Sequence, residues 1–372
     1  MLRSSMRVFL VFAGLLAACS GPGTSPVAPL QNSGLPGTTQ SRNSRVPSSP
    51  YTFTLLQAPQ PLFRDYGAAP PKIATASDGA IWYGGQSNST FPAVRLMPGA
   101  GAKEFFFPTP YPSAEPFVPG DAATGSDGRI WFNDGDFFCG LGAITNAGTT
   151  TEYPIANTPY IGGCITSIGL GPNSNMWFVL RQTDPHNNLF AGYITPSGKS
   201  RRFQLNVPPV DFAFSQIVMG ADGNLWTGGH NVLIRITPSG VATTFPTTAN
   251  LFAYSVAAGP DGNIWYCGLL SYDNFICGRM NTSGHVVSTY TPPIPSKLYD
   301  LVAAPDGNMW ITGTSNHGPF LLRATSSGTF TKFHLPNGAG DPGGITVGRD
   351  GNLYFTILNG SNGYNVGKFT LP

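Results

Sequence analysis

The chain repeats one pattern of apolar and turn residues seven times between residue 73 and its C-terminal end. Each copy has a short apolar run, a turn that contains Asp-Gly in six copies, and a second apolar run, as in VAAGPDGNIWYCG at residues 256–268. Asp-Gly between two apolar runs is a strong signal for a β-hairpin, because the turn needs a residue that adopts a positive φ. The turn residues are Asp78, Asp127, Asn173, Asp222, Asp261, Asp306 and Asp350.

A second turn follows most copies and divides the rest of each unit into two further strands. In the fourth unit, Pro238-Ser239-Gly240 separates the run 233–237 from the run 242–245. Successive turn residues lie 39 to 49 positions apart, which is the period of a β-propeller with one blade per unit. The runs are apolar at nearly every position, as in strands that are covered on both faces. The sequence therefore predicts an all-β, seven-bladed β-propeller of four-stranded antiparallel blades over residues 51–372.

The seventh unit has only three predicted strands, the third at residues 365–370. Residues 51–56 match the fourth strands of other units but precede the first unit. We therefore expect residues 51–56 to pair with residues 365–370 and to complete the seventh blade, which removes an open sheet edge.

Aromatic residues stand at a constant offset from the turns. We expect them to pack between blades, because they lie within apolar runs; a set for stacking sugars is the alternative. They are Trp82, Trp131, Trp177, Trp226, Trp265 and Trp310, with Tyr354 in the seventh place.

Residues 1–18 have the pattern of a signal peptide. Arg3 and Arg7 precede an apolar run, residues 8–16, that is too short to span a bilayer. The run ends in Leu16-Ala17-Ala18-Cys19, which resembles the bacterial lipobox, whose Cys becomes the lipidated first residue of the mature protein. We expect Cys19 to carry a lipid anchor and residues 19–50, rich in Ser, Pro and Gly, to form a disordered tether. The expected location is the bacterial cell envelope, on an outer membrane, facing the periplasm or the exterior.

Charge gives no sign of a nucleic-acid partner. The chain has 20 Lys and Arg against 18 Asp and Glu, and removal of Arg3 and Arg7 leaves 18 of each sign. No large basic cluster remains, so we expect neither nucleic acid nor anionic lipid as a partner, and we expect a monomer.

The repeat resembles that of the virginiamycin B lyase family. GPDGNIW at residues 259–265 and RITPSG at residues 235–240 are close to the family consensus. The resemblance implies a seven-bladed propeller and a metal-assisted elimination that linearises a cyclic depsipeptide antibiotic. In the family a His seven residues before a turn Asp removes the proton, and a Glu seven residues after it binds Mg²⁺ with a second His. Because positions equidistant from a hairpin turn lie side by side, these two slots are expected to be adjacent.

This chain fills those slots differently. Seven residues before the turns stand Pro71, Gly120, Thr166, Ser215, Tyr254, Tyr299 and Gly343. Seven residues after the turns stand Gly85, Asp134, Leu180, Gly229, Gly268, Gly313 and Ile357. None of the first set is His, and only Asp134 of the second is acidic. The sequence therefore assigns no catalytic residue, and these positions predict no cofactor.

The polar residues expected near the mouth of the central channel are candidates for binding a ligand. They are Lys72, Asp121, Asp134, Gln216, His230, Tyr254, Tyr299 and Asp300. Asp121 and Asp134 flank one turn and could hold Mg²⁺ or Ca²⁺ through oxygens. They could also form a solvated acidic rim with Lys72 as their partner, and the sequence favours this second interpretation.

Four Cys remain after Cys19. An even number in an oxidising compartment suggests disulfides. Cys267 and Cys277 lie on neighbouring strands of one unit and are predicted to pair, which leaves Cys139 with Cys164.

The sequence thus favours an envelope-anchored propeller that binds a small molecule, glycan or protein at its channel mouth. The alternative is a metal-dependent C–O lyase or lactonase-like enzyme with its site at the same mouth.

Overall fold

A computed structural model describes residues 51–56, 72–85, 90–108, 117–134, 140–155, 164–181, 188–207, 216–271, 274–291, 296–336, 338–358 and 364–371. All of them belong to one compact unit, Ser49–Pro372. The predicted signal peptide, the tether, Cys19 and Cys139 lie outside the described residues, so the lipid anchor and the Cys139–Cys164 pair stay predictions. Among the described residues, no helix is both long and apolar enough to cross a membrane.

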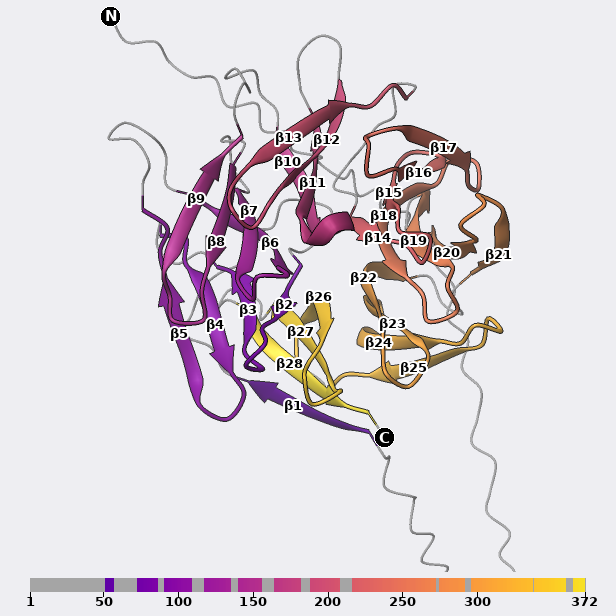
Figure 1. Ribbon diagram of the computed structural model, residues 1–372. Coiled ribbons are helices and arrows are strands. Elements are labelled where there is room, and N and C mark those ends of the chain that lie inside the picture. The colour runs from indigo at the N-terminus through magenta and orange to yellow at the C-terminus, as the bar shows by residue number, and fades with distance from the viewer. Residues whose placement is uncertain are drawn as a thin grey trace, which may run out of the picture. The chain divides into compact units, whose positions relative to one another are not determined.

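The described strands form seven four-stranded antiparallel sheets arranged as the blades of a propeller (Figure 1). Blades 1 to 3 consist of β2 (Ala74–Thr75), β3 (Ile81–Gly84), β4 (Ala93–Met97), β5 (Gly101–Phe105); β6 (Pro119–Thr124), β7 (Ile130–Asp134), β8 (Gly140–Ile144), β9 (Thr150–Pro154); and β10 (Cys164–Leu170), β11 (Met176–Arg181), β12 (Leu189–Ile194), β13 (Ser200–Gln204). Blades 4 and 5 consist of β14 (Ile217–Met219), β15 (Leu225–Gly228), β16 (Val232–Ile236), β17 (Ala242–Pro246); and β18 (Phe252–Ala258), β19 (Ile264–Ser271), β20 (Asn274–Met280), β21 (Val286–Tyr290). Blades 6 and 7 consist of β22 (Lys297–Ala303), β23 (Met309–Ser315), β24 (Gly318–Ala324), β25 (Phe330–His334); and β26 (Asp341–Val347), β27 (Leu353–Leu358), β28 (Tyr364–Thr370), β1 (Thr52–Leu56). A short 3₁₀ helix, Pro172–Ser174, replaces the Asp-Gly turn of blade 3.

The predicted closure of the ring is confirmed. Strand β1 pairs with β28 in antiparallel register from Thr52 opposite Thr370 to Leu56 opposite Val366, and it completes the seventh sheet. Tyr51, just before β1, packs against Phe333 of blade 6 with ring centroids 4.5 Å apart, and its hydroxyl accepts a hydrogen bond from Arg323 at 2.8 Å. Residues from both ends of the described chain therefore hold blade 7 together and join it to blade 6.

The repeated turn combines backbone geometry with a side-chain anchor. In blade 5 the amide of Gly262, at φ 76°, donates to the carbonyl of Gly259 at 3.1 Å. The carboxylate of Asp261 accepts from the amide of Asn263 at 3.2 Å and from the indole N–H of Trp265 at 3.0 Å. The Asp-Gly-Asn-x-Trp spacing thus places the indole donor over its own turn, a role of the Asp that turn propensity alone does not reveal.

The constant distance of the Trp residues from the turns reflects packing between strands and blades, as predicted. All six Trp side chains are fully buried. Trp265 stacks on Tyr290 of the outer strand β21, with ring centroids 5.7 Å apart. On its other side the Tyr290 ring contacts Gly328 in a turn of blade 6, where a Cβ would lie 2.2 Å from the ring. A glycine is therefore required in that turn because the next blade's backbone rests directly on the aromatic ring.

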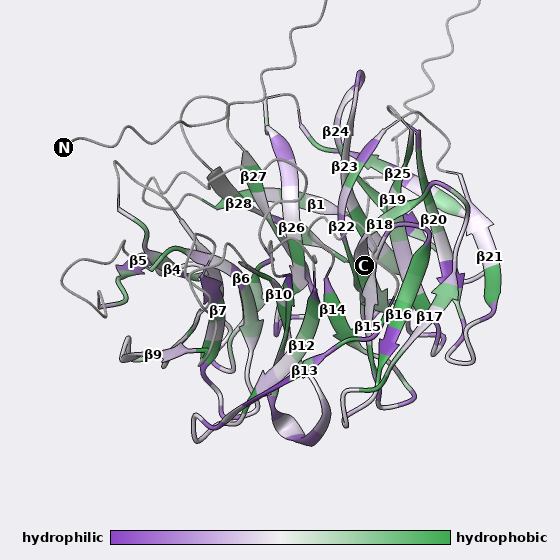
Figure 2. Cartoon of the chain, turned by 90° about the horizontal axis from the view of Figure 1, so that it is seen from above, coloured by the Kyte–Doolittle hydropathy of each residue, from purple (hydrophilic) through white to green (hydrophobic). Residues whose placement is uncertain are grey.

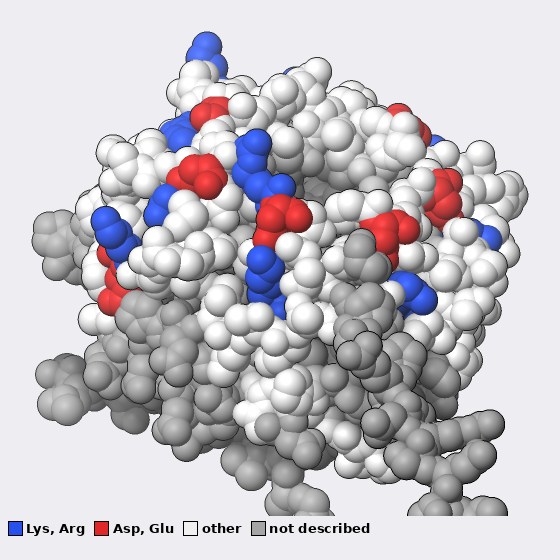
Figure 3. Space-filling view, turned by 90° about the horizontal axis from the view of Figure 1, so that it is seen from below, with Lys and Arg blue, Asp and Glu red and all other residues white. Residues whose placement is uncertain are grey.

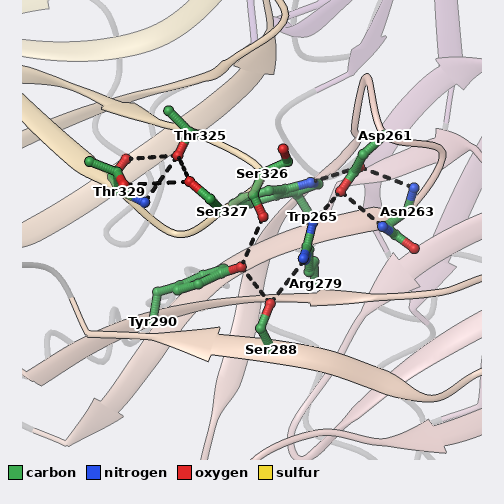
Figure 4. A network of polar contacts seen from close by, with 10 residues as sticks. All are labelled: Asp261, Asn263, Trp265, Arg279, Ser288, Tyr290, Thr325, Ser326, Ser327 and Thr329. Atoms are coloured by element: carbon green, nitrogen blue, oxygen red, sulfur yellow. Dashed lines mark hydrogen bonds and ion pairs between the residues drawn. The ribbon is translucent and has the colours of Figure 1, made fainter.

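Polar contacts continue the same link between blades 5 and 6 (Figure 4). Arg279 donates to Asp261 at 2.8 Å and to the hydroxyl of Ser288 at 2.9 Å. Ser288 donates to the hydroxyl of Tyr290 at 2.5 Å, and Tyr290 reaches the carbonyl of Ser326 in blade 6 at 3.5 Å. Asp261, Trp265 and Tyr290 of blade 5 therefore belong to one connected set of contacts that reaches blade 6.

Hydrophobic residues gather on the inner strands of the blades, and polar residues are more frequent on the outer strands. Hydrophobic colour follows strands such as β14 and β15, whereas the outer strands β9 and β13 are more polar (Figure 2). On the face shown in Figure 3, acidic and basic side chains lie next to one another. The ion pairs of the described residues include Arg95 with Asp78 at 2.6 Å. No side of that view carries a large patch of one sign, which agrees with the balanced charge of the sequence.

The structure contains the predicted disulfide between Cys267 of β19 and Cys277 of β20. The two residues are directly opposite each other in the antiparallel register and are buried. The bridge therefore links neighbouring strands of the same sheet.

Removal of residues 51–56 tests the closure of the ring. We expect this deletion to lower the unfolding midpoint by on the order of 10 °C or to prevent folding, because β28 loses its partner strand and Phe333 loses Tyr51. Thermal unfolding followed by circular dichroism measures the change. Deletion of residues 21–50 is the matched control and is expected to leave the midpoint nearly unchanged; equal effects would contradict the closure.

Glu152 gives the stability a defined pH dependence. Burial raises the pKa of its carboxyl from the ordinary value of 4.5 to about 7, and its Oε1 atom has no hydrogen-bond partner among the described residues. The folded state thus binds this proton more tightly than the unfolded state. The contribution of Glu152 is fully present below about pH 4.5 and is lost as the pH rises through about 7.

We therefore expect Glu152→Gln to increase the free energy of unfolding at about pH 8 and to change it little at about pH 5. Denaturant unfolding at the two pH values measures this. Glu104→Gln, at an exposed position of β5, is the control and is expected to have little effect. Equal effects of Glu152→Gln at both pH values would show that the carboxyl is not neutral in the folded protein.

Candidate functional site

The inner strands share an irregularity at one position. In five blades the register between the first and second strands shifts at the seventh residue before the turn, and in blades 2, 6 and 7 the sixth residue is skipped as well. The shifts lie between Pro119 and Ala122, Ile165 and Ser167, Ala253 and Ser255, Leu298 and Leu301, and Pro342 and Ile345. Such β-bulges re-aim side chains away from the regular pleat.

The bulge corrects one expectation about the slots. The residue seven after the turn faces the residue eight before it, as in Asp134 opposite Pro119 and Gly313 opposite Leu298. The expected pairing of the two slots is wrong by one position, because the first strand carries an extra residue. The residues at the bulge are therefore released from pairing with the second strand.

We call the residues six positions before each turn residue the axial set; in five blades they lie in the bulge or directly after it. The set consists of Lys72, Asp121, Ser167, Gln216, Ser255, Asp300 and Gly344. Six blades contribute a polar side chain and blade 7 contributes glycine. The sequence identified four of the polar members; Ser167 and Ser255 were missed, although counting six positions back from every turn would have found them.

Hydrogen bonds join the axial set across blades that are not neighbours. The amide of Gln216 in blade 4 donates to the carboxylate of Asp300 in blade 6 at 2.5 Å, past blade 5. Ser255 of blade 5 donates to the same carboxylate at 3.2 Å. A direct contact between blades 4 and 6 is possible only if these side chains lie close to the propeller axis.

Asp300 is the centre of this half of the axial set. It is buried, and besides Gln216 and Ser255 it accepts hydrogen bonds from the amides of Leu301 at 2.8 Å and Ile345 of blade 7 at 3.0 Å. Thr312, also missed by the sequence analysis, is buried beside it and donates to the carbonyl of Gly343 at 2.7 Å. Blades 4 to 7 are thereby joined by one carboxylate whose acceptor sites are occupied by protein donors.

Lys72 and Asp121 form the other half and are only half-buried. The backbone amide of Lys72 donates to Asp121 Oδ1 at 3.0 Å, and the amide of Ala122 donates to the carbonyl of Lys72 at 3.0 Å. Burial lowers the pKa of the Lys72 ammonium group, and the charges of Asp300 and Asp121 oppose this shift. Burial likewise raises the pKa of the Asp121 carboxyl against the charge of Lys72. Burial thus shifts the two pKa values toward each other, down for Lys72 and up for Asp121.

The remaining candidates lie around this axial set in different roles. Tyr254 is buried and donates from its hydroxyl to the carbonyl of Leu298 in blade 6 at 2.5 Å; burial, with the charge of Tyr299, raises its pKa well above the usual value. Tyr299 is half-buried beside it. His230 stacks face to face on Phe252, with ring centroids 4.1 Å apart. These aromatic groups belong to blades 4 to 6.

Asp134 and Asp121 make different hydrogen bonds. Asp134 is buried, and its Oδ1 accepts from the amide of Val118 at 3.2 Å, whereas Asp121 binds the amide of Lys72. Among the described residues, no three or more His, Cys, Asp and Glu side chains are grouped so that they could hold a metal ion. The donor set that we describe does not fit the family's Mg²⁺ site, and we derive no step through a metal.

Replacement of Asp300 tests the axial hydrogen bonds. We expect Asp300→Ala to lower the free energy of unfolding by on the order of 3 kcal/mol or more, because several buried donors lose their acceptor at about 1–3 kcal/mol each. Urea unfolding measures the loss. Asp300→Asn keeps an acceptor oxygen and is expected to cost clearly less. An Asp300→Ala protein as stable as the wild type would contradict a structural role for the carboxylate.

Solved structures of similar fold include lyases. A streptogramin B lyase is 24% identical, with a TM-score of 0.67, over 87% of this chain and 98% of its own length. A virginiamycin B lyase from Staphylococcus aureus is 24% identical, with a TM-score of 0.65, over 87% of this chain and 100% of its own; it has also been solved in a catalytically inactive form with quinupristin. The structure of YCF48 bound to D1 peptide is 12% identical, with a TM-score of 0.59, over 87% of this chain and 98% of its own. These likenesses show the fold.

A family comparison gives the relationship. A comparison with curated proteins found no match. The model of the virginiamycin B lyase family matches residues 183–371, just over half of the sequence. Together with the seven-bladed fold and the resemblance of the repeats, this match places the chain among known proteins: it belongs to the virginiamycin B lyase family.

Proposed function

We propose that the protein is a lipid-anchored propeller of the bacterial cell envelope that binds a small molecule, glycan or protein at the end of its axis away from the Asp-Gly turns. In this proposal the family fold is kept as a binding module and the family's elimination is lost. The ligand contacts come from the bulged ends of the inner strands, where Lys72, Asp121, Tyr299 and His230 are partly accessible.

The observation that carries the proposal is that Tyr254 and Asp134, two described residues at the family's base and carboxylate positions, are bound to the protein's own backbone. At the base slots, Tyr254 donates its hydroxyl proton to a backbone carbonyl and is strongly disfavoured as an anion. At the carboxylate slots, the acidic side chain of Asp134 is buried against the amide of Val118. Both groups are engaged in holding the fold, which supports binding over proton abstraction.

Propellers of this fold have been solved with ligands. One lyase of this fold was solved with quinupristin, and another propeller of this fold was solved with a bound peptide. A ligand at the proposed end of the axis of this chain would meet aromatic groups of blades 4 to 6 on one side. On the other side it would meet Gly120, Lys72 and Asp121.

The lipid anchor rests on the lipobox at Cys19 and on the tether composition of residues 19–50. A tethered propeller would hold its binding site near a membrane surface without being embedded in it.

The loss of elimination is tested with a streptogramin B antibiotic and added Mg²⁺. We expect no linear product above the background without protein, because no His stands at any base slot. Mass spectrometry of the antibiotic measures linearisation, and a family lyase is the positive control. Metal-dependent turnover would overturn the proposal and favour the enzyme alternative, with Asp121 and Asp134 as the first residues to replace. A shift in the thermal midpoint without turnover would identify the antibiotic as a ligand.

The anchor is tested by replacing the lipidated residue. We expect Cys19→Ala to move the protein from the membrane fraction to the soluble fraction, since a thioether-linked lipid cannot form. Ser20→Ala, which keeps the Cys, is the control and should stay with the membrane. Immunoblots of fractionated cells measure this, and membrane association of Cys19→Ala equal to that of the wild type would contradict the anchor.

A further inference from the structure

The residue directly after each axial residue directs its backbone N–H away from its own blade. In blade 1 the amide of Ala76, two positions before the turn, donates to the carbonyl of Ala80 in the second strand at 2.8 Å. Bonded and non-bonded pairs alternate along an antiparallel ladder, so Ile73, three positions earlier, does not donate to the second strand. Such an inward N–H needs an acceptor from another blade or from outside the protein.

Axial side chains of the preceding blade supply this acceptor at three junctions between blades. The pairs are Ile217 N–H with Ser167 Oγ at 3.2 Å, Val256 N–H with Gln216 Oε1 at 3.2 Å, and Ile345 N–H with Asp300 Oδ2 at 3.0 Å. Where the axial residue is Lys72, whose ammonium group cannot accept, the amide of Ala122 donates to the Lys72 backbone carbonyl at 3.0 Å. At these junctions the axial set satisfies the inward N–H of the blade that follows.

The inward N–H of Ile73 in blade 1 lacks such a partner. The axial residue of the preceding blade 7 is Gly344, which lies in the same kind of bulge as Asp300 but has no side chain. Ile73 is buried, and among the described residues no acceptor lies within hydrogen-bond distance of its N–H. A buried backbone N–H without an acceptor is rare in folded proteins, so its place at the axis points to an acceptor that a ligand brings.

The neighbours of the Ile73 N–H decide which acceptor fits. Lys72, the preceding residue, donates its backbone amide to Asp121 Oδ1 at 3.0 Å. From blade 7, the amide of Ile345 donates to Asp300 Oδ2 at 3.0 Å. Carboxylates near the site disfavour an anionic oxygen, whereas they favour a neutral acceptor that also carries N–H donors.

Gln216 shows how a carboxamide fills the equivalent position in another blade. Its Oε1 accepts from the amide of Val256 at 3.2 Å, and its Nε2 donates to Asp300 at 2.5 Å. One planar group thus satisfies the inward N–H of the next blade and also binds a carboxylate at the axis. A ligand carboxamide beside Gly344 can make the same two kinds of contact.

We propose that Ile73, Gly344 and Asp121 form a subsite for a primary carboxamide group of the ligand. The amide oxygen accepts from the N–H of Ile73, and the NH2 group points toward Asp121. Lys72 and Asp121 are half-buried, so the subsite borders a part of the axis that solvent reaches. The inference rests on the proposed function, because it names the chemical group by which a ligand at this end of the axis is held.

Titration with acetamide tests the subsite on the full-length protein. Two-dimensional NMR of ¹⁵N-labelled protein follows the amide signals of Ile73 and of Val256, whose acceptor is Gln216. We expect a saturable shift of the Ile73 signal, with a dissociation constant on the order of 10–100 mM for so small a probe, and no shift of the Val256 signal. Acetate, which has a similar shape and a negative charge, is expected to give no saturable shift.

Replacement of the axial glycine locates the subsite. In Gly344→Gln the new carboxamide is expected to bind the Ile73 N–H, to slow its hydrogen exchange several-fold and to abolish the response to acetamide. Gly344 does not adopt a positive φ, so its backbone accepts a side chain without strain. Gly140→Gln is the matched control and is expected to change neither measurement, because an added Cβ there meets no atom closer than 3.7 Å.

The absence of a saturable shift at Ile73, or equal shifts at Ile73 and Val256, would overturn the proposal. A response to acetamide that persists in Gly344→Gln, or tighter binding of acetate than of acetamide, would overturn it as well. If Gly344→Gln does not fold, the comparison of acetamide with acetate in the wild type still decides. A failed titration leaves binding through Tyr299 and His230 untouched, whereas turnover of a streptogramin B antibiotic would overturn the proposed function and leave the acetamide result standing.

Discussion

The hydrogen bond between Gln216 and Asp300 joins two blades that are not neighbours, and much of the structure depends on it. At 2.5 Å it requires the inner strands of blades 4 and 6 to bring their side chains to the axis. In blade 6 a bulge leaves Asp300 unpaired with the second strand, and in blade 4 Gln216 stands just before the first residue of β14. The outer parts of the blades are held by contacts between adjacent blades, whereas the axial set ties distant blades together.

The axial set has two halves with different consequences. Around Asp300 the donors and acceptors satisfy one another, so burial of this charge is compatible with a stable fold. Around Lys72 and Asp121 the groups are partly accessible, and burial lowers the pKa of Lys72 and raises the pKa of Asp121. Lys72 and Asp121 each follow directly on a residue of the base slots, Pro71 and Gly120, so this half of the axial set borders the positions of the family's chemistry.

Local patterns in the sequence predicted most of the fold. The Asp-Gly turns and the apolar runs predicted the hairpins of each blade, and the unmatched segment at residues 51–56 predicted the strand that closes the ring. The structure confirms these strand pairings. The disulfide between Cys267 and Cys277 was predicted for the same reason, since both lie on adjacent strands. Packing of the Trp residues followed from their place within apolar runs.

The site was less predictable because its geometry depends on the bulge. Counting equal distances from a turn assumes a regular register, and one extra residue on the first strand displaces every partner beyond it. The count therefore singled out Asp134, which binds a backbone amide in its own blade, and omitted Ser167, Ser255 and Thr312. Contacts across the axis, such as that between Gln216 and Asp300, join positions 84 residues apart and leave no local pattern in the sequence.

The central claim is that the axial set is a cooperative part of the folded core. Native-state hydrogen exchange of the amide of Ile345 in blade 7, which donates to Asp300 of the neighbouring blade 6, tests it most directly. The account predicts that this amide exchanges only through global unfolding, with the same free energy and denaturant dependence as amides beside the buried Trp310. Exchange of Ile345 by local opening, at a clearly lower free energy that denaturant does not change, would contradict the account.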